Sequence, residues 1–338
     1  MNRFGYTRAG SVAEAIQAFA AHPDARFIAG GTNLVDLMKY DVETPDHLVD
    51  ITRLPLDQVE DGTDGALRVG ALVGNADLAY DRRVQERFPL LASALLAGAS
   101  PQLRNMATTG GNLLQRTRCH YFYDPATPCN KREPGTGCPA IQGVNRNHAI
   151  LGTSERCIAT HPSDLCVALA ALEATVLVTG PNGDRRIPFA EFHRLPDDRP
   201  EIDTTLAPGE LITAVEIPAA DFGAHHTYLK LRDRHSYAFA LVSVAAGLAM
   251  DGGRIVRARL ALGGVAHKPW RDPAAEALLS GQPATDDSFR KAADHLLSGA
   301  VPRSGNGFKI ALARRAIVRA LRQAAAGTPQ SQTDKRIQ

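Results

Sequence analysis

The sequence lacks a long apolar run. Its longest candidate, Ala238 to Met250, is shorter than the roughly 20 residues that cross a bilayer, and its Val, Ala and Leu content predicts a buried strand. The first residues lack the apolar core of a secretory signal, so we expect a partner to carry this chain if it leaves the cytoplasm. The net charge is only +2, which gives no indication of a nucleic-acid partner.

Two further absences concern chemistry. No Gly-x-Gly-x-x-Gly segment occurs, which argues against a dinucleotide-binding fold of the Rossmann type. Cysteine is sparse, and its five residues are one too many for a complete disulfide framework. Four of the five lie between Cys119 and Cys157, which indicates a metal or cluster site instead.

A chain of 338 residues predicts two or three domains. We expect an α+β protein with a small first unit at 1–60, a second unit at 61–222 and a third unit at 223–326. The second unit contains an irregular insertion at 116–159, where Pro, Gly, Asn and Cys dominate and no helical or strand period persists. A polar tail at 327–338 is predicted to be disordered.

Capping residues and hydrophobic periods predict the individual elements. Ser11 and Glu14 form a capping box before a helix over 12–19, Asn33 is the expected cap of a helix over 34–40, and Ser163 that of a helix ending at 172. Strands are predicted at 26–29, 47–51, 67–73, 175–178, 228–232, 240–250 and 255–262, and further helices at 75–80, 90–97, 273–279, 288–297 and 309–325. The last three strands predict an antiparallel sheet that helices cover.

Two glycine-rich turns have the composition of a phosphate-binding site. Ala29 to Asn33 lies between a predicted strand and a predicted helix, where two glycines bring successive N–H groups close to an anion. The helix start adds unpaired N–H groups and the positive end of a dipole. Thr108 to Asn112 repeats the combination of hydroxyls, glycines and an amide. Each turn taken alone is equally compatible with a plain loop.

A third segment, Ala159 to Leu165, contains Asp164 at the start of a predicted helix. Its carboxylate is placed to accept hydrogen bonds from a ribose or ribityl hydroxyl. The alternative is that Asp164 only complements the helix dipole.

These segments occur in the order and spacing of a known family, together with a basic strand: Gly30 to Leu34, Thr108 to Asn112, Pro162 to Leu165 and Lys230 to Arg232. They resemble the FAD-binding medium subunit of the xanthine dehydrogenase, aldehyde oxidase and carbon monoxide dehydrogenase group. The segment Ala261 to Ala266 resembles the C-terminal flavoprotein domain of that family. The resemblance implies a two-subdomain FAD-binding fold of the PCMH type, followed by a C-terminal flavoprotein domain with an antiparallel sheet and helices.

The resemblance also implies which residues bind FAD. The diphosphate is expected along the first glycine-rich turn, and the ribityl chain and flavin near the later polar residues. The implied set is Arg26, Phe27, Ile28, Ala29, Gly30, Gly31, Thr32, Asn33, Leu34, Thr108, Gly111, Asn112, Asp164, Ile212 and Lys230. With Arg232 and Arg234, Lys230 equally fits a solvated basic face of a strand.

The four cysteines of the insertion form the candidate metal site. Nine, eight and eighteen residues separate Cys119, Cys129, Cys138 and Cys157. Four thiolates are the ligand set of a [4Fe-4S] cluster, whereas structural zinc usually takes paired ligands two to four residues apart. The spacing therefore favours an iron–sulfur cluster, with His148 and His161 as neighbours that can replace a thiolate. Cys166, within an apolar helix, is interpreted as a small buried hydrophobe.

The insertion is most similar to the branch of the family formed by FAD-binding subunits of periplasmic aldehyde oxidoreductases. This branch implies electron transfer from a molybdopterin-binding large subunit and a [2Fe-2S] small subunit, through FAD, to an external acceptor. It also implies a periplasmic complex exported on a partner's twin-arginine signal, with a cytoplasmic location as the alternative. Two other functions stay open: a self-sufficient flavin oxidase and a non-catalytic module held by zinc.

Overall fold

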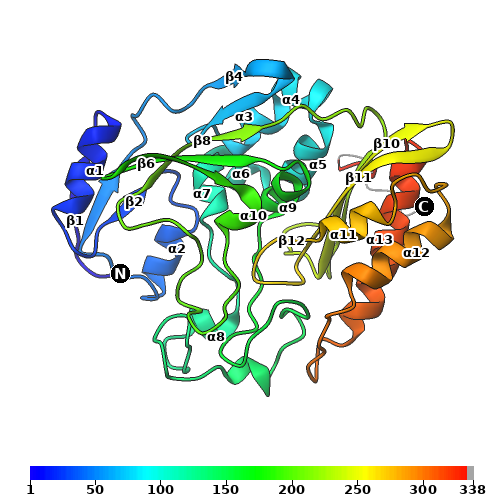
Figure 1. Ribbon diagram of the computed structural model, residues 1–338. Coiled ribbons are helices and arrows are strands. Elements are labelled where there is room, and N and C mark those ends of the chain that lie inside the picture. Colours follow the sequence, from blue (N-terminus) through cyan, green and yellow to red (C-terminus); the bar gives the residue numbers. More distant parts are fainter. Residues whose placement is uncertain (333–338) are drawn as a thin grey trace.

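Figure 1 shows a computed structural model of the chain, which describes residues 1–332. Three β-sheets, each with its own helices, follow one another along the chain, so the fold is α+β as expected. Within residues 1–332, no helix is both long and apolar enough to span a membrane.

The first sheet is parallel and contains three strands. They lie in the order β1 (Gly5–Arg8), β3 (His47–Asp50) and β2 (Arg26–Ile28), with helices α1 (Val12–Ala20) and α2 (Leu34–Lys39) between them in sequence. Ser11 caps α1 as predicted, but the return bond of the capping box goes to Gly10 and not to Ser11. The Ser11 hydroxyl accepts a hydrogen bond from the Glu14 backbone N–H at 3.1 Å, and the Glu14 carboxylate accepts one from Gly10 at 2.8 Å.

The second sheet is antiparallel and contains five strands, in the order β4 (Val59–Asp61), β5 (Leu67–Gly70), β8 (Leu211–Ile217), β6 (Thr175–Gly180) and β7 (Gly183–Pro188). Its short helices are η1 (Thr63–Gly65), α3 (Asn75–Tyr80), α4 (Arg82–Arg87), α5 (Pro89–Ala97), α6 (Pro101–Met106), α7 (Thr109–Leu113), α9 (Asp164–Ala171) and α10 (Phe189–Phe192). Every residue of α9 is buried, because this helix is apolar on all sides and lies inside the core.

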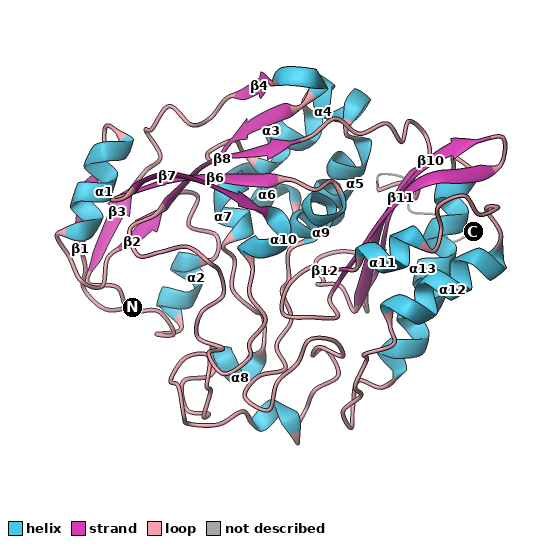
Figure 2. Cartoon of the chain, in the orientation of Figure 1, coloured by secondary structure: helices cyan, strands magenta, loops and turns pink. Residues whose placement is uncertain are grey.

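The insertion at 116–159 contains only α8 (His120–Tyr123) and η2 (Pro139–Ile141), and Figure 2 shows it as loops in the lower part of the view. Hydrogen bonds replace the missing regular structure. The Asn130 side-chain oxygen accepts from the backbone N–H groups of Gly135 at 3.1 Å and Gly137 at 2.8 Å, and its amide donates to the Arg156 carbonyl at 2.9 Å.

The third sheet is antiparallel, with strands β9 (His226–Leu231), β10 (Val242–Asp251), β11 (Arg254–Gly263) and β12 (Trp270–Arg271). Helices α11 (Pro273–Ala277), α12 (Asp286–Leu296) and α13 (Phe308–Ala325) accompany it, with α13 packed on β9 and β10 (Figure 1). The sequence predicted three strands here. The fourth, β12, has two residues and is too short to leave a period.

The predicted disordered tail at 327–338 falls partly on residues 333–338, which lie outside the described residues. Within the described part, the Gln330 backbone N–H donates to the Thr227 hydroxyl at 2.9 Å, and the Gln332 side chain donates to the Tyr228 carbonyl at 2.9 Å. Residues 330–332 therefore run along β9.

The third unit has its own apolar core, and part of its sheet also packs into the core of the second unit. Tyr228, Ala245 and Ala261 of the third sheet belong to the same buried group as helices α5 and α9. Gly263 lies so close to α9 that a Cβ there would be 2.6 Å from the Val167 side chain. This contact fixes β9 to β11 against the start of α9, where the functional site is found.

Candidate functional site

One cavity of about 880 Å³ lies where the three units meet. Its walls come from the β2–α2 turn, the α6–α7 segment, the start of α9, β8, and the loop between β9 and β10. The structure brings all fifteen residues of the predicted FAD-binding set to this cavity: Arg26, Phe27, Ile28, Ala29, Gly30, Gly31, Thr32, Asn33, Leu34, Thr108, Gly111, Asn112, Asp164, Ile212 and Lys230. Its volume is within the range of small-molecule and cofactor sites.

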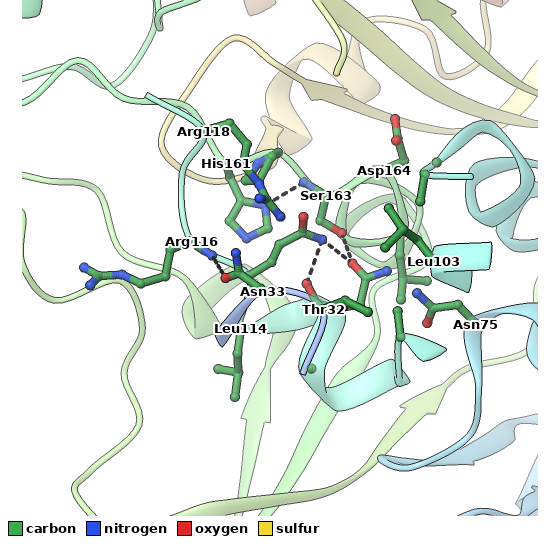
Figure 3. Close-up of a pocket in the computed structure, with 18 of the residues that line it drawn as sticks. Thr32, Asn33, Asn75, Leu103, Leu114, Arg116, Arg118, His161, Ser163 and Asp164 are labelled. Atoms are coloured by element: carbon green, nitrogen blue, oxygen red, sulfur yellow. Dashed lines mark hydrogen bonds between the residues drawn. The ribbon is translucent and has the colours of Figure 1, made fainter. Parts of the chain in front are cut away.

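The first glycine-rich turn combines a left-handed residue with a close backbone approach. Gly31 has φ 70°, a conformation that glycine adopts without strain. A Cβ on Gly30 would lie 1.8 Å from the Met106 carbonyl oxygen, so only glycine lets this turn approach the end of α6. Asn33 occupies the predicted cap position of α2, but its side chain does not cap the helix. Its side chain makes no cap hydrogen bond, because its oxygen accepts from the Arg116 backbone N–H at 2.9 Å instead (Figure 3).

The second glycine-rich segment is the first turn of helix α7 and not a loop. The Thr108 hydroxyl caps this helix by accepting from the Gly111 backbone N–H at 3.3 Å. The Asn112 side-chain oxygen accepts from the Ser163 hydroxyl at 2.6 Å, which connects α7 to the cap of α9. Ser163 caps α9 as predicted, by accepting from the Cys166 backbone N–H at 3.1 Å.

Asp164 and Lys230 form a buried ion pair in the cavity wall. The Lys230 Nζ lies 2.7 Å from the Asp164 Oδ2, with side-chain exposures of 4% and 8%. The Tyr228 hydroxyl donates to the other Asp164 oxygen at 2.7 Å, and burial beside this carboxylate raises the pKa of Tyr228 well above its usual value. Lys230 is therefore not part of a solvated basic face.

Several buried polar atoms of the cavity wall have no hydrogen-bond partner within the described chain. They are the Asn33 Nδ2, the Asn75 Oδ1, the Arg118 Nε, the His148 Nδ1 and the His161 Nε2. Figure 3 labels the side chains of Asn33, Asn75, Arg118 and His161 around the pocket. Buried polar groups are normally paired, so this combination of donors and acceptors fits a ligand with many polar groups. The sequence did not predict Asn75 or Arg118 at the site, since neither belongs to a recognisable motif.

Aromatic side chains of the β9–β10 loop line the cavity and contact the insertion. Phe239, in the β9–β10 loop, lies 5.1 Å below the Arg118 guanidinium, a cation–π contact between the third unit and the insertion. Tyr237 in the same loop is exposed and has φ 51°. Both aromatic residues line the cavity.

The four cysteines of the insertion converge on a second, much smaller cavity. Cys119, Cys129, Cys138 and Cys157 all line it. Among residues 1–332, no three of these sulfur atoms all lie within 4.8 Å of one another. The group of possible metal ligands that does satisfy this distance consists of His161, Cys166 and His193. Four sulfurs around one zinc ion, at bonds of about 2.3 Å, would be separated by about 3.8 Å.

Cys129 and Cys157 are buried, Cys119 and Cys138 are half-buried, and backbone N–H groups lie near the sulfurs of Cys119, Cys138 and Cys157. Burial raises the pKa of Cys119 to about 12 and that of Cys157 to about 11, while N–H groups of Phe122 and Tyr121 act in the opposite direction on Cys119. Burial also raises the pKa of Cys138. Burial therefore disfavours the thiolate form of Cys119, Cys138 and Cys157, and a bound cation would favour it.

His148 and Lys131 lie beside the cysteines. The His148 Nε2 is 3.1 Å from the Cys119 sulfur, and burial next to His120 and Lys309 lowers the pKa of His148 to about 4. Lys131, with 1% of its side chain exposed, donates to the Pro200 carbonyl at 2.6 Å and pairs with Asp203.

The two histidines that were predicted as possible replacement ligands, His148 and His161, lie in different positions relative to the cysteines. His161 lines the large cavity and is absent from the wall of the cysteine cavity, whereas His148 lies in that wall. Cys166 is fully buried, and burial raises its pKa to about 12. It packs in the apolar core, as its sequence context predicted.

Comparison with known proteins identifies the class of this site. Residues 2–220 match the FAD-binding domain of molybdopterin dehydrogenases, and residues 226–324 match the C-terminal domain of CO dehydrogenase flavoproteins. The chain therefore belongs to the FAD-binding medium subunits of the molybdenum hydroxylase family. The family binds FAD, and the unpaired donors and acceptors around the large cavity fit such a cofactor.

Individual relatives show how much of the chain is similar and how strongly. The chain is 52% identical to the aldehyde oxidoreductase FAD-binding subunit PaoB of Escherichia coli, over 96% of this chain and 99% of that protein. It is 29% identical to the glyceraldehyde dehydrogenase medium chain of Sulfolobus acidocaldarius, over 89% of each. Among solved structures, a chain of the carbon monoxide dehydrogenase of Hydrogenophaga pseudoflava superimposes with a TM-score of 0.76 at 28% identity, covering 96% of this chain and 98% of that one.

Proposed function

We propose that this chain is the FAD- and [4Fe-4S]-containing electron-transfer subunit of a molybdenum-dependent aldehyde oxidoreductase. The observation that carries the proposal is the convergence of Cys119, Cys129, Cys138 and Cys157 on one cavity beside the FAD-type site. The 52% identity to an aldehyde oxidoreductase subunit over nearly the whole chain supports the aldehyde as the substrate class.

The cysteine geometry supports an iron–sulfur cluster over zinc. The sulfurs are more widely spread than a single tetrahedral ion requires, and a cubane of four irons has its ligand sulfurs farther apart. Backbone N–H groups that face Cys119, Cys138 and Cys157 are the kind of donors that stabilise a cluster's sulfurs. The buried ammonium of Lys131 near Cys157 supplies positive charge beside an anionic cluster.

The proposed division of labour follows the relatives. A large subunit with molybdopterin oxidises the aldehyde to the acid, a small subunit with [2Fe-2S] centres passes the electrons on, and FAD in this chain delivers them to an external acceptor. When bound, FAD supplies the change between two-electron and one-electron chemistry. The residues of this chain hold it: the β2–α2 turn and α7 at the polar end, and the Asp164–Lys230 pair in the wall.

Metal and flavin analysis of the purified complex tests the cofactors. We expect about four irons on this chain beyond those of the small subunit, one FAD and no stoichiometric zinc. Cys129→Ser and Cys138→Ser should each lose this iron and become more sensitive to protease within the insertion, whereas the matched control Cys166→Ser should keep it. Full iron content in both ligand variants, or zinc in place of iron, contradicts the proposal.

We further propose that the assembled complex works in the periplasm and is exported on a partner's twin-arginine signal. Cluster assembly on free thiols favours the reducing cytoplasm, so export would follow cofactor insertion. Fractionation is the test. With the partner's signal deleted, this subunit should remain in the cytoplasm with its flavin, and periplasmic recovery of the subunit when it is expressed alone refutes the passenger route.

A further inference from the structure

The two cavities share a wall. Thr117, Cys119 and His148 line both the large cavity and the cysteine cavity. Of the four converging cysteines in the described chain, Cys119 is the one that also lines the large cavity. The cysteine site is therefore asymmetric, with one ligand position next to the flavin site and three positions away from it.

His148 fills this wall and is held there by the third unit. Only 4% of the residue is exposed, and its Nε2 lies 3.1 Å from the Cys119 sulfur. Its backbone carbonyl accepts from the Lys309 amino group at 2.9 Å and from the Asn306 amide at 3.4 Å. The preceding turn is anchored in the same way, because the Asn145 side-chain oxygen accepts from the Gly305 backbone N–H at 2.7 Å. The start of α13 thus positions the imidazole.

The chemistry of a ligand sulfur fixes the direction of this hydrogen bond. A cysteine that ligates iron is a thiolate without a proton, so it accepts and the His148 Nε2–H donates. A hydrogen bond to a ligand sulfur draws negative charge away from the cluster and favours its reduced state. The Lys131 cation acts on Cys157 and does not line the large cavity.

We propose that His148 is a positioning residue that raises the reduction potential of the iron–sulfur cluster through Cys119, and that this shared wall is where the cluster exchanges electrons with the flavin site. The inference rests on the proposed function, because it requires the cluster to be present. In the exchange the cluster gains one electron for each electron that the flavin loses. No bond forms or breaks, and His148 keeps its Nε2 proton.

The first test is an EPR-monitored redox titration of the purified complex. His148→Ala removes the donor and should lower the midpoint potential of this cluster. His148→Gln restores an N–H donor at similar reach and should return the potential toward that of the unchanged protein. The matched control is His295→Gln, an exposed histidine of α12 that lines neither cavity and lies 3.1 Å from Asp272, and it should leave the potential unchanged.

The second test needs no substitution. Removing FAD from the complex uncovers Thr117, Cys119 and His148, so the EPR spectrum and midpoint potential of the cluster should change between the FAD-free and FAD-loaded forms. This measurement decides the matter if His148→Ala loses its iron. A complex that contains no additional iron overturns the proposed function itself. An intact cluster that responds neither to His148→Ala nor to FAD removal overturns only this inference.

Discussion

Asp203 is the residue whose replacement should loosen the insertion most. It lies outside the cysteine segment, yet its carboxylate contacts Lys131, and the Arg116 Nε at 2.8 Å. Burial alone would raise the pKa of Asp203, but Lys131, Arg116 and a nearby His267 more than offset this and hold it well below its usual range. One carboxylate therefore neutralises two cations at the base of the insertion.

Asp203→Asn keeps the shape of the side chain and removes its charge. Arg116 retains Glu43 as a partner, but the buried Lys131 ammonium is left with a carbonyl and no carboxylate. Removing one partner of a buried ion pair costs about 3–5 kcal/mol. For a chain of 338 residues that melts as one unit, this corresponds to a fall in Tm of about 4–7 °C.

Calorimetry of the purified complex, together with limited proteolysis of residues 116–159, measures the effect. The matched control Asp294→Asn breaks an exposed pair with Arg314, where the two side chains are 53% and 49% exposed, and should change little. Adding Lys131→Met to Asp203→Asn removes the unpaired ammonium and should restore part of the lost Tm. An Asp203→Asn protein with unchanged Tm and protease pattern refutes the assignment of Asp203 as the anchor of the insertion.

Three further predictions concern the large cavity and the third unit. Gly30→Ala places a Cβ 1.8 Å from a backbone carbonyl of α6, so the FAD-to-protein ratio should fall, while Gly299→Ala, with open space around it, should retain FAD. Lys230→Met leaves the buried Asp164 carboxylate without its cation and should weaken FAD retention in dialysis, which full occupancy would contradict. Burial lowers the pKa of Lys309 from 10.5 to about 7, so between pH 7 and 10.5 the folded chain has released a proton that the unfolded chain keeps. Its contribution to stability therefore rises with pH across this window, and Lys309→Met should flatten the rise in Tm measured from pH 7 to 9.5.

The sequence predicted the large cavity well because its residues lie in short local motifs. The β2–α2 turn and the start of α9 each combine glycine or a capping residue with a change of secondary structure, and such signals are readable within a few positions. The same local reasoning failed at Asn33. Its side chain does not cap the helix, because its oxygen accepts a hydrogen bond from the backbone N–H of Arg116, 83 residues away.

The residues that sequence reasoning missed act through contacts between distant segments. Asp203 lies in an irregular stretch between α10 and β8, and nothing near it in sequence indicates that it pairs with Lys131, 72 residues earlier. His148 was identified only as a possible replacement ligand. Its position in the wall between two cavities depends on Asn306 and Lys309, which follow it by more than 150 residues. Pairings of this kind leave no period or spacing in a single sequence.

The hydrogen bond between Lys309 and the insertion forms only after the C-terminal part of the chain has been translated. Lys309 donates to the His148 carbonyl at 2.9 Å, yet it is translated about 150 residues after Cys157, the last of the four converging cysteines. At about 5–20 residues per second, the ribosome needs roughly 8–30 s to cover that interval. During this time the thiols exist without the residue that holds the His148 backbone. Under the proposed function, an iron–sulfur donor would therefore meet the four cysteines before α13 docks on the insertion.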